Sequence, residues 1–112
     1  MHKIEAIIQP HKLDDVRAAL DEAGITGLTI SEVHGHGRQK GHSHVYRGNE
    51  YKVDLIPKVK IELVIPESRT EDVIGVICKA AQTGKVGDGK IFVSEIRETV
   101  RIRNGDRGEL AL

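Results

Sequence analysis

Three things are scarce in this chain: aromatic side chains, net charge and long apolar runs. It has no Trp, one Phe and two Tyr in 112 residues, whereas sheets that bind RNA stack several bases on aromatic rings. Its 17 basic and 17 acidic residues cancel, so no overall field draws the protein onto nucleic acid or an anionic membrane. We therefore expect no nucleic-acid partner, and any site for an anion must be local.

The apolar runs are too short for a membrane span. Ala6–Ile8 and Leu63–Ile65 are typical of them, and a helix needs about 20 apolar residues to cross a bilayer. Met1–Lys3 leads directly into a strand pattern, without the apolar region of a signal peptide. We expect a cytoplasmic protein that does not insert into membranes.

Cysteine is nearly absent as well. The chain's one cysteine, Cys78, has no partner for an internal disulfide. It lies within a helical apolar pattern, which predicts a buried structural thiol rather than a reactive one.

What the chain does contain is an orderly series of strand and helix patterns. Apolar patterns predict four strands, at Lys3–Gln9, Gly27–Val33, Val59–Ile65 and Lys90–Ile96, with strict alternation at Val59–Ile65 and imperfect alternation at Gly27–Val33. Helical spacing predicts two helices, with inner faces formed by Leu13, Val16, Leu20 and Ala23, and by Val73, Ile74, Ile77 and Ala81. Gly24 and Gly84 would end these helices, and Ser68 with Glu71 predicts a capping box for the second.

The order β-α-β-β-α-β is that of an α+β, ferredoxin-like fold, in which two helices cover one face of an antiparallel sheet. We expect one domain over residues 1–112, with a long flexible loop at about 37–55 between the second and third strands and a C-terminal segment at about 99–112. The second face of the sheet would be bare and only partly polar. It is a candidate subunit contact, so we expect a homo-oligomer.

The long loop is the expected working part. Residues 35–51 read GHGRQKGHSHVYRGNEY, a patterned set of cations, amides, imidazoles and phenols. Unstructured connections beyond about 12 to 15 residues are uncommon in compact domains unless they bind something or are disordered. We expect this loop to be mobile in the free protein and ordered by ligands or partners.

Two further segments carry chemistry. In residues 83–90, TGKVGDGK, three glycines allow backbone N–H groups to face an anion, and Lys90 adds a charge. The alternative is a plain turn after a helix, and the match to a P-loop is poor because Ile91 stands where Ser or Thr should hold Mg²⁺. In Val100–Arg103 an extended chain would project Arg101 and Arg103 to one side, which suits a polyphosphate, although solvated arginines are the plainer reading.

Together these segments resemble the PII nitrogen-regulatory signal proteins. The resemblance rests on four motifs that agree in spacing over the whole chain, namely GHGRQKGH through YRGNEY at 35–51, PKVKIE at 57–62, TGKVGDGKIF at 83–92 and VRIRNG at 100–105. It implies a homotrimer that senses ATP or ADP in clefts between subunits, with 2-oxoglutarate beside Mg²⁺-ATP, and that is not an enzyme.

The resemblance also implies roles for individual residues. Nucleotide would be bound by Thr29, Gly35, Arg38, Glu62, Val64, Gly87, Asp88, Gly89, Lys90, Arg101 and Arg103. 2-Oxoglutarate would be bound by Gly37, Gln39, Lys40, Gly41 and Lys58, with Lys58 on its distal carboxylate. Gln39 would also supply an amide oxygen to Mg²⁺, a hard cation that prefers oxygen ligands.

By the same resemblance the loop would present different surfaces with different ligands bound. The implied partners are an ammonium transporter, nucleotidyl-transfer enzymes and other nitrogen-metabolism enzymes. Tyr51 would be a possible acceptor of a nucleotidyl group, whereas Asn49 replaces the serine that some members phosphorylate.

Histidines depart from the family pattern and leave an alternative open. His11 and His36 stand where phenylalanine is common, and His44 where an acidic or polar residue is usual. His34, His36, His42 and His44 form two His-x-His pairs, and such pairs can share a transition-metal ion. The alternative hypothesis is therefore a metal-responsive PII paralogue that uses the loop histidines.

Overall fold

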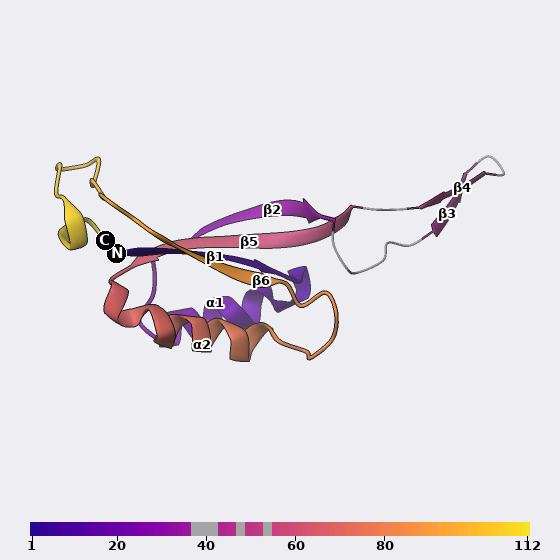
Figure 1. Cartoon of the computed structure of the whole chain (residues 1–112), viewed down its shortest axis with the longest axis horizontal. Coiled ribbons are helices and arrows are strands. Elements are labelled where there is room, and N and C mark those ends of the chain that lie inside the picture. Colours follow the sequence, from indigo (N-terminus) through magenta and orange to yellow (C-terminus); the bar gives the residue numbers. More distant parts are fainter. Residues whose placement is uncertain (37–42, 47–48, 53–54) are drawn as a thin grey trace.

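The computed structural model describes residues 1–36, 43–46, 49–52 and 55–112 (Figure 1). In chain order the elements, with η marking a 3₁₀ helix, are β1 (His2–Ile8), η1 (Pro10–Lys12), α1 (Leu13–Glu22), β2 (Thr29–Gly35), β3 (Ser43–Tyr46), β4 (Asn49–Lys52), β5 (Ile56–Ile65), η2 (Glu67–Arg69), α2 (Thr70–Ala81), β6 (Lys90–Glu95) and η3 (Gly108–Ala111). Without the 3₁₀ turns and the β3–β4 pair, this is the predicted β-α-β-β-α-β order.

The main sheet has four antiparallel strands in the order β2-β5-β1-β6. Both α helices lie on one face of it (Figure 1), so the predicted α+β, ferredoxin-like fold is confirmed. The strands β3 and β4 form a separate antiparallel pair, with Ser43 opposite Lys52. This pair was not predicted from the sequence, and it lies within residues 37–55, which were expected to form one loop.

The core lies between the sheet and the two helices. Strand β5 has the clearest pattern, since Val59, Ile61, Leu63 and Ile65 are buried while the residues between them are half-buried. Ile4, Ala6 and Ile8 of β1, Val16 and Leu20 of α1, and Val73, Ile77 and Ala81 of α2 complete the buried cluster. These residues fall on the faces that the periodicity predicted, and their burial fixes the register of the sheet.

The second helix begins differently from the prediction. The η2 turn runs directly into α2, so Ser68 lies inside a helical turn and cannot take the extended conformation of an N-cap residue. No side chain caps the amide groups at the start of α2. The predicted capping box of Ser68 and Glu71 is therefore wrong. Thr70 at this end instead contacts His2 of β1, with 2.7 Å between its hydroxyl oxygen and Nδ1 of the imidazole.

Cys78 is exposed, so the prediction of a buried thiol is wrong as well. The buried positions of α2 repeat every fourth residue, at Val73, Ile77 and Ala81. Cys78 follows Ile77 and is rotated by about 100° around the helix from it, out of the buried stripe. An apolar neighbourhood in the sequence did not fix the side of the helix.

The opposite face of the sheet carries half-buried charges. The ammonium group of Lys3 lies 3.0 Å from a carboxylate oxygen of Glu5 and 3.1 Å from one of Glu62, and Lys60 lies 3.4 Å from Glu62. Hydrogen bonds to Glu5 and then Glu62 raise the pKa of Lys3, and the bond from Lys3 lowers the pKa of Glu62. Beside these pairs Phe92 of β6 remains 55% exposed. Within the ranges that the structure describes, no helix is both long and apolar enough to span a membrane.

Candidate ligand-binding site

The predicted site residues divide into two groups at opposite ends of the sheet. Lys58 and Val64 both lie on β5, six residues apart, which corresponds to about 20 Å of extended chain. The first group, at the Lys58 end, contains Gly35, Lys58, Gly87, Asp88, Gly89 and Lys90. The second group contains Thr29, Glu62, Val64, Arg101 and Arg103, near the chain termini (Figure 1).

The turn between α2 and β6 belongs to the first group, and the two groups are named the first and second candidate half-sites, or half-sites for short. Its glycines Gly84, Gly87 and Gly89 have φ angles of +84°, +105° and +99°. Residues other than glycine rarely adopt φ angles in this region. Successive backbone N–H groups in such conformations can face one anion. These φ angles are compatible both with a plain turn and with a phosphate-binding turn, so the two alternatives from the sequence stay open.

The carboxylate of Asp88 holds this turn in place. It accepts hydrogen bonds from the Thr83 amide at 2.7 Å, the Thr83 hydroxyl at 2.5 Å and the Gly84 amide at 2.8 Å. Gln9 donates to it from the end of β1 at 3.3 Å. The side chain of Asp88 is thus bonded within the turn, and the proposed contribution to a ligand comes from the backbone at this position.

These hydrogen bonds predict a specific acid response. Donation by the Thr83 hydroxyl, followed by that of the Thr83 amide, lowers the pKa of Asp88 from 3.8 to about 2. A lowered pKa stabilises the folded state above the unfolded-state value near 3.8, and this stability is lost as pH falls from there toward 2. We expect Asp88→Asn to lower the melting temperature at pH 7, with the difference from wild type shrinking between pH 4 and pH 2.

Melting curves at a series of pH values check this, with Glu22→Gln on the exposed side of α1 as a charge-matched control. A difference between wild type and Asp88→Asn that stayed constant down to pH 2 would contradict the assignment.

Two contacts attach the turn to the neighbouring strands. Lys58 is 9% exposed and donates from Nζ to the Gly87 carbonyl oxygen at 2.6 Å. Gly89 lies so close to β1 that a Cβ atom placed on it would fall 2.8 Å from the Ile7 carbonyl carbon and closer still to the carbonyl oxygen. Gly35 packs on the same lysine, since a Cβ atom placed on Gly35 would lie 3.4 Å from Cγ of Lys58. Lys58 therefore connects the glycine turn to the end of β2, where the predicted loop begins.

The second half-site includes the paired strands β2 and β5. Thr29 lies opposite Glu62, and Val64 lies opposite Lys3. Glu62 is shared by two lysines, as described above, and Thr29 is exposed. This end of the open sheet face therefore presents a polar edge beside an apolar Val64 side chain that is half-buried.

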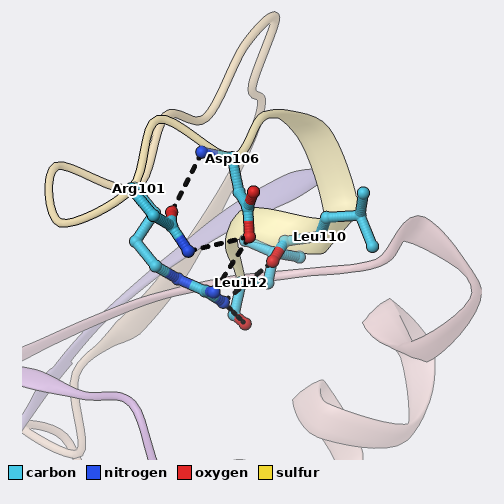
Figure 2. A network of polar contacts seen from close by, with 5 residues as sticks. Arg101, Asp106, Leu110 and Leu112 are labelled. Atoms are coloured by element: carbon cyan, nitrogen blue, oxygen red, sulfur yellow. Dashed lines mark hydrogen bonds and ion pairs between the residues drawn. The ribbon is translucent and has the colours of Figure 1, made fainter.

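The arginines of the second half-site do not lie in an extended chain. Val100 pairs with Arg107, and residues 102–104 form a turn that Gly105, with a φ angle of +77°, completes. The predicted extended segment Val100–Arg103 is therefore wrong, and the argument for parallel guanidinium groups from alternation does not apply. Arg103 is exposed in the turn, whereas Arg101 contacts the chain's own C-terminal segment (Figure 2).

Several predicted residues lie outside the described part of the chain. Gly37, Arg38, Gln39, Lys40 and Gly41 fall between residues 36 and 43, and so does His42. Tyr51 belongs to β4, and His44 to β3, but only their backbones are described. His34 and His36 are exposed. Among residues 1–36 and 55–112, no three His, Cys, Asp or Glu side chains gather as a metal site would require, and the four-histidine hypothesis stays untested.

Sequence reasoning missed three residues that build these half-sites. Thr83 and Gln9 hold Asp88, and Asp106 holds Arg101. The signals were available: a Thr just after a helix with an Asp-Gly turn five residues later, and Asn104-Gly105 before Asp106, are both typical of side chains that bond to the backbone of a turn. Gln9, which is close to Asp88 only in the folded sheet, had no such signal.

The fold and the two half-sites define a ferredoxin-like protein with a glycine turn suited to an anion. The family description "Nitrogen regulatory protein P-II" matches residues 1–106. Nitrogen regulatory protein P-II 1 of Escherichia coli strain K12 is 56% identical over 112 residues, all of both chains. Nitrogen regulatory protein P-II of Mesorhizobium japonicum is 61% identical over 108 residues, 96% of each chain, and that of Pasteurella multocida is 55% identical over 112 residues, all of both chains.

The chain belongs to the P-II family of nitrogen regulatory proteins. Its general role is therefore signal transduction in the regulation of nitrogen metabolism. Which ligands, which partners and which assembly serve that role are separate questions.

Proposed function

We propose that this protein senses ATP or ADP together with 2-oxoglutarate, in sites shared between subunits, and regulates nitrogen-assimilation proteins in response. One observation carries the proposal: residues suited to a single anionic ligand lie at the two opposite ends of one sheet. A ligand that uses both groups must contact two copies of the chain.

The first half-site suits phosphate groups. The glycine turn supplies backbone N–H groups in left-handed conformations, and Lys90, which is exposed at the start of β6, supplies a positive charge. Arg101 and Arg103 from the second half-site of a neighbouring copy would add guanidinium groups, which bind phosphate through paired hydrogen bonds. Thr29, Glu62 and Val64 beside those arginines would then contact the nucleoside.

The effector site would adjoin the phosphates. Lys58 is nearly buried at the base of the loop and already donates to the glycine turn, so a carboxylate bound to Lys58 would lie next to the phosphate site. Gln39 would ligate Mg²⁺ through its amide oxygen, and the backbone from Gly37 to Gly41 would bind the remaining carboxylate of 2-oxoglutarate. Mg²⁺ keeps few protein ligands and completes its shell with phosphates and water, which suits a site with one amide.

The assembly proposed is a closed homotrimer. Contacts between two different surfaces of identical chains generate rings when the rotation closes, and the two half-sites are such different surfaces. The exposed Phe92 and Val93 of β6 and the half-buried ion pairs of the sheet face provide further surface for these contacts.

The regulated partners proposed are an ammonium transporter, nucleotidyl-transfer enzymes and other enzymes of nitrogen metabolism. Ligands bound at the base of the loop would select among its conformations, because a ligand shifts an equilibrium only through contacts that differ between the states. Tyr51, in β4, would be available to a nucleotidyl-transfer enzyme. The protein would itself be a regulator rather than a catalyst.

The first test is the loss of nucleotide binding on removing one arginine. We expect Arg103→Ala to weaken ATP binding by about 1.5 to 3 kcal/mol, the range for a hydrogen bond to a charged group, with little change in melting temperature because Arg103 is exposed. Calorimetric titration with ATP measures this, and Arg17→Ala on exposed α1 is the matched control. Unchanged ATP affinity in Arg103→Ala would remove the arginine from the site.

Co-expressing two defective chains then tests the sharing of sites. Lys90→Ala damages one half-site and Arg103→Ala the other, so random mixing in a ring restores about one quarter of the sites, wherever two intact halves meet. The expected result is that about a quarter of the sites in the mixture bind ATP with wild-type affinity, whereas each variant alone binds ATP only weakly. No recovery would locate the whole site within one chain.

A further inference from the structure

The C-terminal segment, residues 99–112, folds back onto itself. The Arg101 amide donates to the Asp106 carbonyl at 2.8 Å, the Gly105 amide to the Arg101 carbonyl at 2.7 Å, and the Gly108 amide to the Thr99 carbonyl at 2.9 Å. With the bridge between Val100 and Arg107, these bonds close a compact loop. The η3 turn follows this loop and brings the last residues next to Arg101 (Figure 2).

The guanidinium group of Arg101 is surrounded by oxygen atoms of this same segment. Its Nη1 lies 3.2 Å from a carboxylate oxygen of Asp106, and its Nη2 donates to main-chain oxygen atoms of Leu110 at 2.8 Å and Leu112 at 3.4 Å (Figure 2). The Asp106 carboxylate and the main-chain oxygens thus face Nη1 and Nη2 of Arg101. A phosphate group presents negatively charged oxygens to an arginine in a similar way.

The oxygen atoms are themselves held in position. The Asp106 carboxylate accepts a hydrogen bond from Nδ2 of Asn104 at 3.1 Å, and the Asp106 amide donates to Oδ1 of Asn104 at 3.0 Å. From the other side Glu98 accepts a bond from the Gly108 amide at 3.2 Å and lies 3.6 Å from Arg107. Hydrogen bonds within the segment therefore hold its acceptor oxygens in place around Arg101.

We propose that the C-terminal segment is an internal competitor for Arg101, and that Asp106 sets the affinity for ligands that carry phosphate groups. The inference rests on the proposed function, in which Arg101 binds the phosphates of a nucleotide. A phosphate that binds the Nη1 and Nη2 hydrogens directed at Asp106, Leu110 and Leu112 must first displace these oxygen atoms.

The cost of this displacement lowers the apparent affinity by the fraction of chains in which Arg101 is available. It applies to every ligand that needs Arg101 and to none that does not. ATP and ADP should therefore be affected, whereas adenosine, which has no phosphate, should not.

The test is Asp106→Asn, which removes the charge and keeps the size of the side chain. Because the side chains of Arg101 and Asp106 are 31% and 42% exposed, the pair is partly screened, and we expect ATP and ADP to bind about threefold to fivefold more tightly. Glu109→Gln is the matched control, since it removes one negative charge from the exposed side of the same segment. Adenosine affinity should be the same in all three proteins.

A second variant protects the test against a folding defect in the first. Glu98→Ala removes the acceptor of the Gly108 amide and the ion pair with Arg107 without touching Arg101, and it should tighten ATP binding in the same direction. Melting temperatures identify any variant that fails to fold.

The remaining outcomes separate the two proposals. Unchanged or weaker ATP binding in Asp106→Asn would overturn the competition, and weaker binding would make Asp106 a residue that positions Arg101 for phosphate. Equal tightening in Glu109→Gln would assign the effect to net charge and overturn the inference. Failure of wild type and all variants to bind ATP would overturn the proposed function, and the inference with it.

Discussion

Gly89→Ala should destabilise the fold by roughly 2 to 6 kcal/mol and abolish nucleotide binding, since a left-handed φ angle and a backbone clash each cost about 1 to 3 kcal/mol. Gly89 has a φ angle of +99°, and the new Cβ would overlap the Ile7 carbonyl group. That carbonyl belongs to the backbone of β1 and cannot rotate away as a side chain could. The beginning of β6 would have to separate from β1, and the glycine turn would lose its shape.

Gly84→Ala provides the control for this prediction. Gly84 lies in the same turn with a φ angle of +84°, but a Cβ placed on it meets nothing within 4 Å. Its cost is limited to backbone strain, about 1 to 2 kcal/mol. Urea unfolding at equilibrium measures both variants, and equal losses for the two would show that packing against Ile7 does not constrain the turn.

The second large effect is expected for Lys58→Met, which keeps the length of the side chain and removes its charge. We expect it to abolish the response to 2-oxoglutarate, because Lys58 is the lysine that bonds to the glycine turn and packs against the end of β2, where the effector would bind. ADP should still bind, with affinity reduced only as far as the Gly87 carbonyl loses its partner. Calorimetry with ADP, with Mg²⁺-ATP, and with Mg²⁺-ATP plus 2-oxoglutarate distinguishes these effects.

Gln39→Ala should give the same pattern, since Gln39 would act through Mg²⁺ and the effector. Lys79→Met, on the exposed side of α2, is the control for loss of a lysine. If Lys58→Met weakened all three ligands equally, the lysine would be needed for the fold of the site rather than for the effector.

The strands and helices could be predicted because burial follows a period. On β5 every second residue from Val59 is buried, as the alternation indicated, and on α2 the buried Val73, Ile77 and Ala81 belong to the predicted inner face. Predictions failed where the local structure depends on a single tertiary or neighbouring contact. The start of α2 depends on η2, and the side on which Cys78 lies depends on how the helix is rotated against the sheet. Neither is visible in local periodicity.

The sequence identified candidate residues of the site, but it did not predict where these residues lie on the sheet. Resemblance named Thr29, Lys58 and Arg101, but their distribution to opposite ends of the sheet follows from strand register, which pairs residues far apart in the chain. Likewise the hydrogen bond from Gln9 to Asp88 joins positions that are 79 residues apart. The turn at Asn104 and Gly105 could have been foreseen, because Asn-Gly is a strong turn signal that should have argued against an extended Val100–Arg103.

With the two half-sites at opposite ends of one sheet, the proposed ring would make ligand binding depend on how much of the protein is present. If a complete site needs two copies, diluting the protein until the ring dissociates lowers the apparent affinity for nucleotide, and nucleotide in turn holds the ring together. The abundance of the chain would then be an input to the sensor in its own right, alongside the small molecules that it binds.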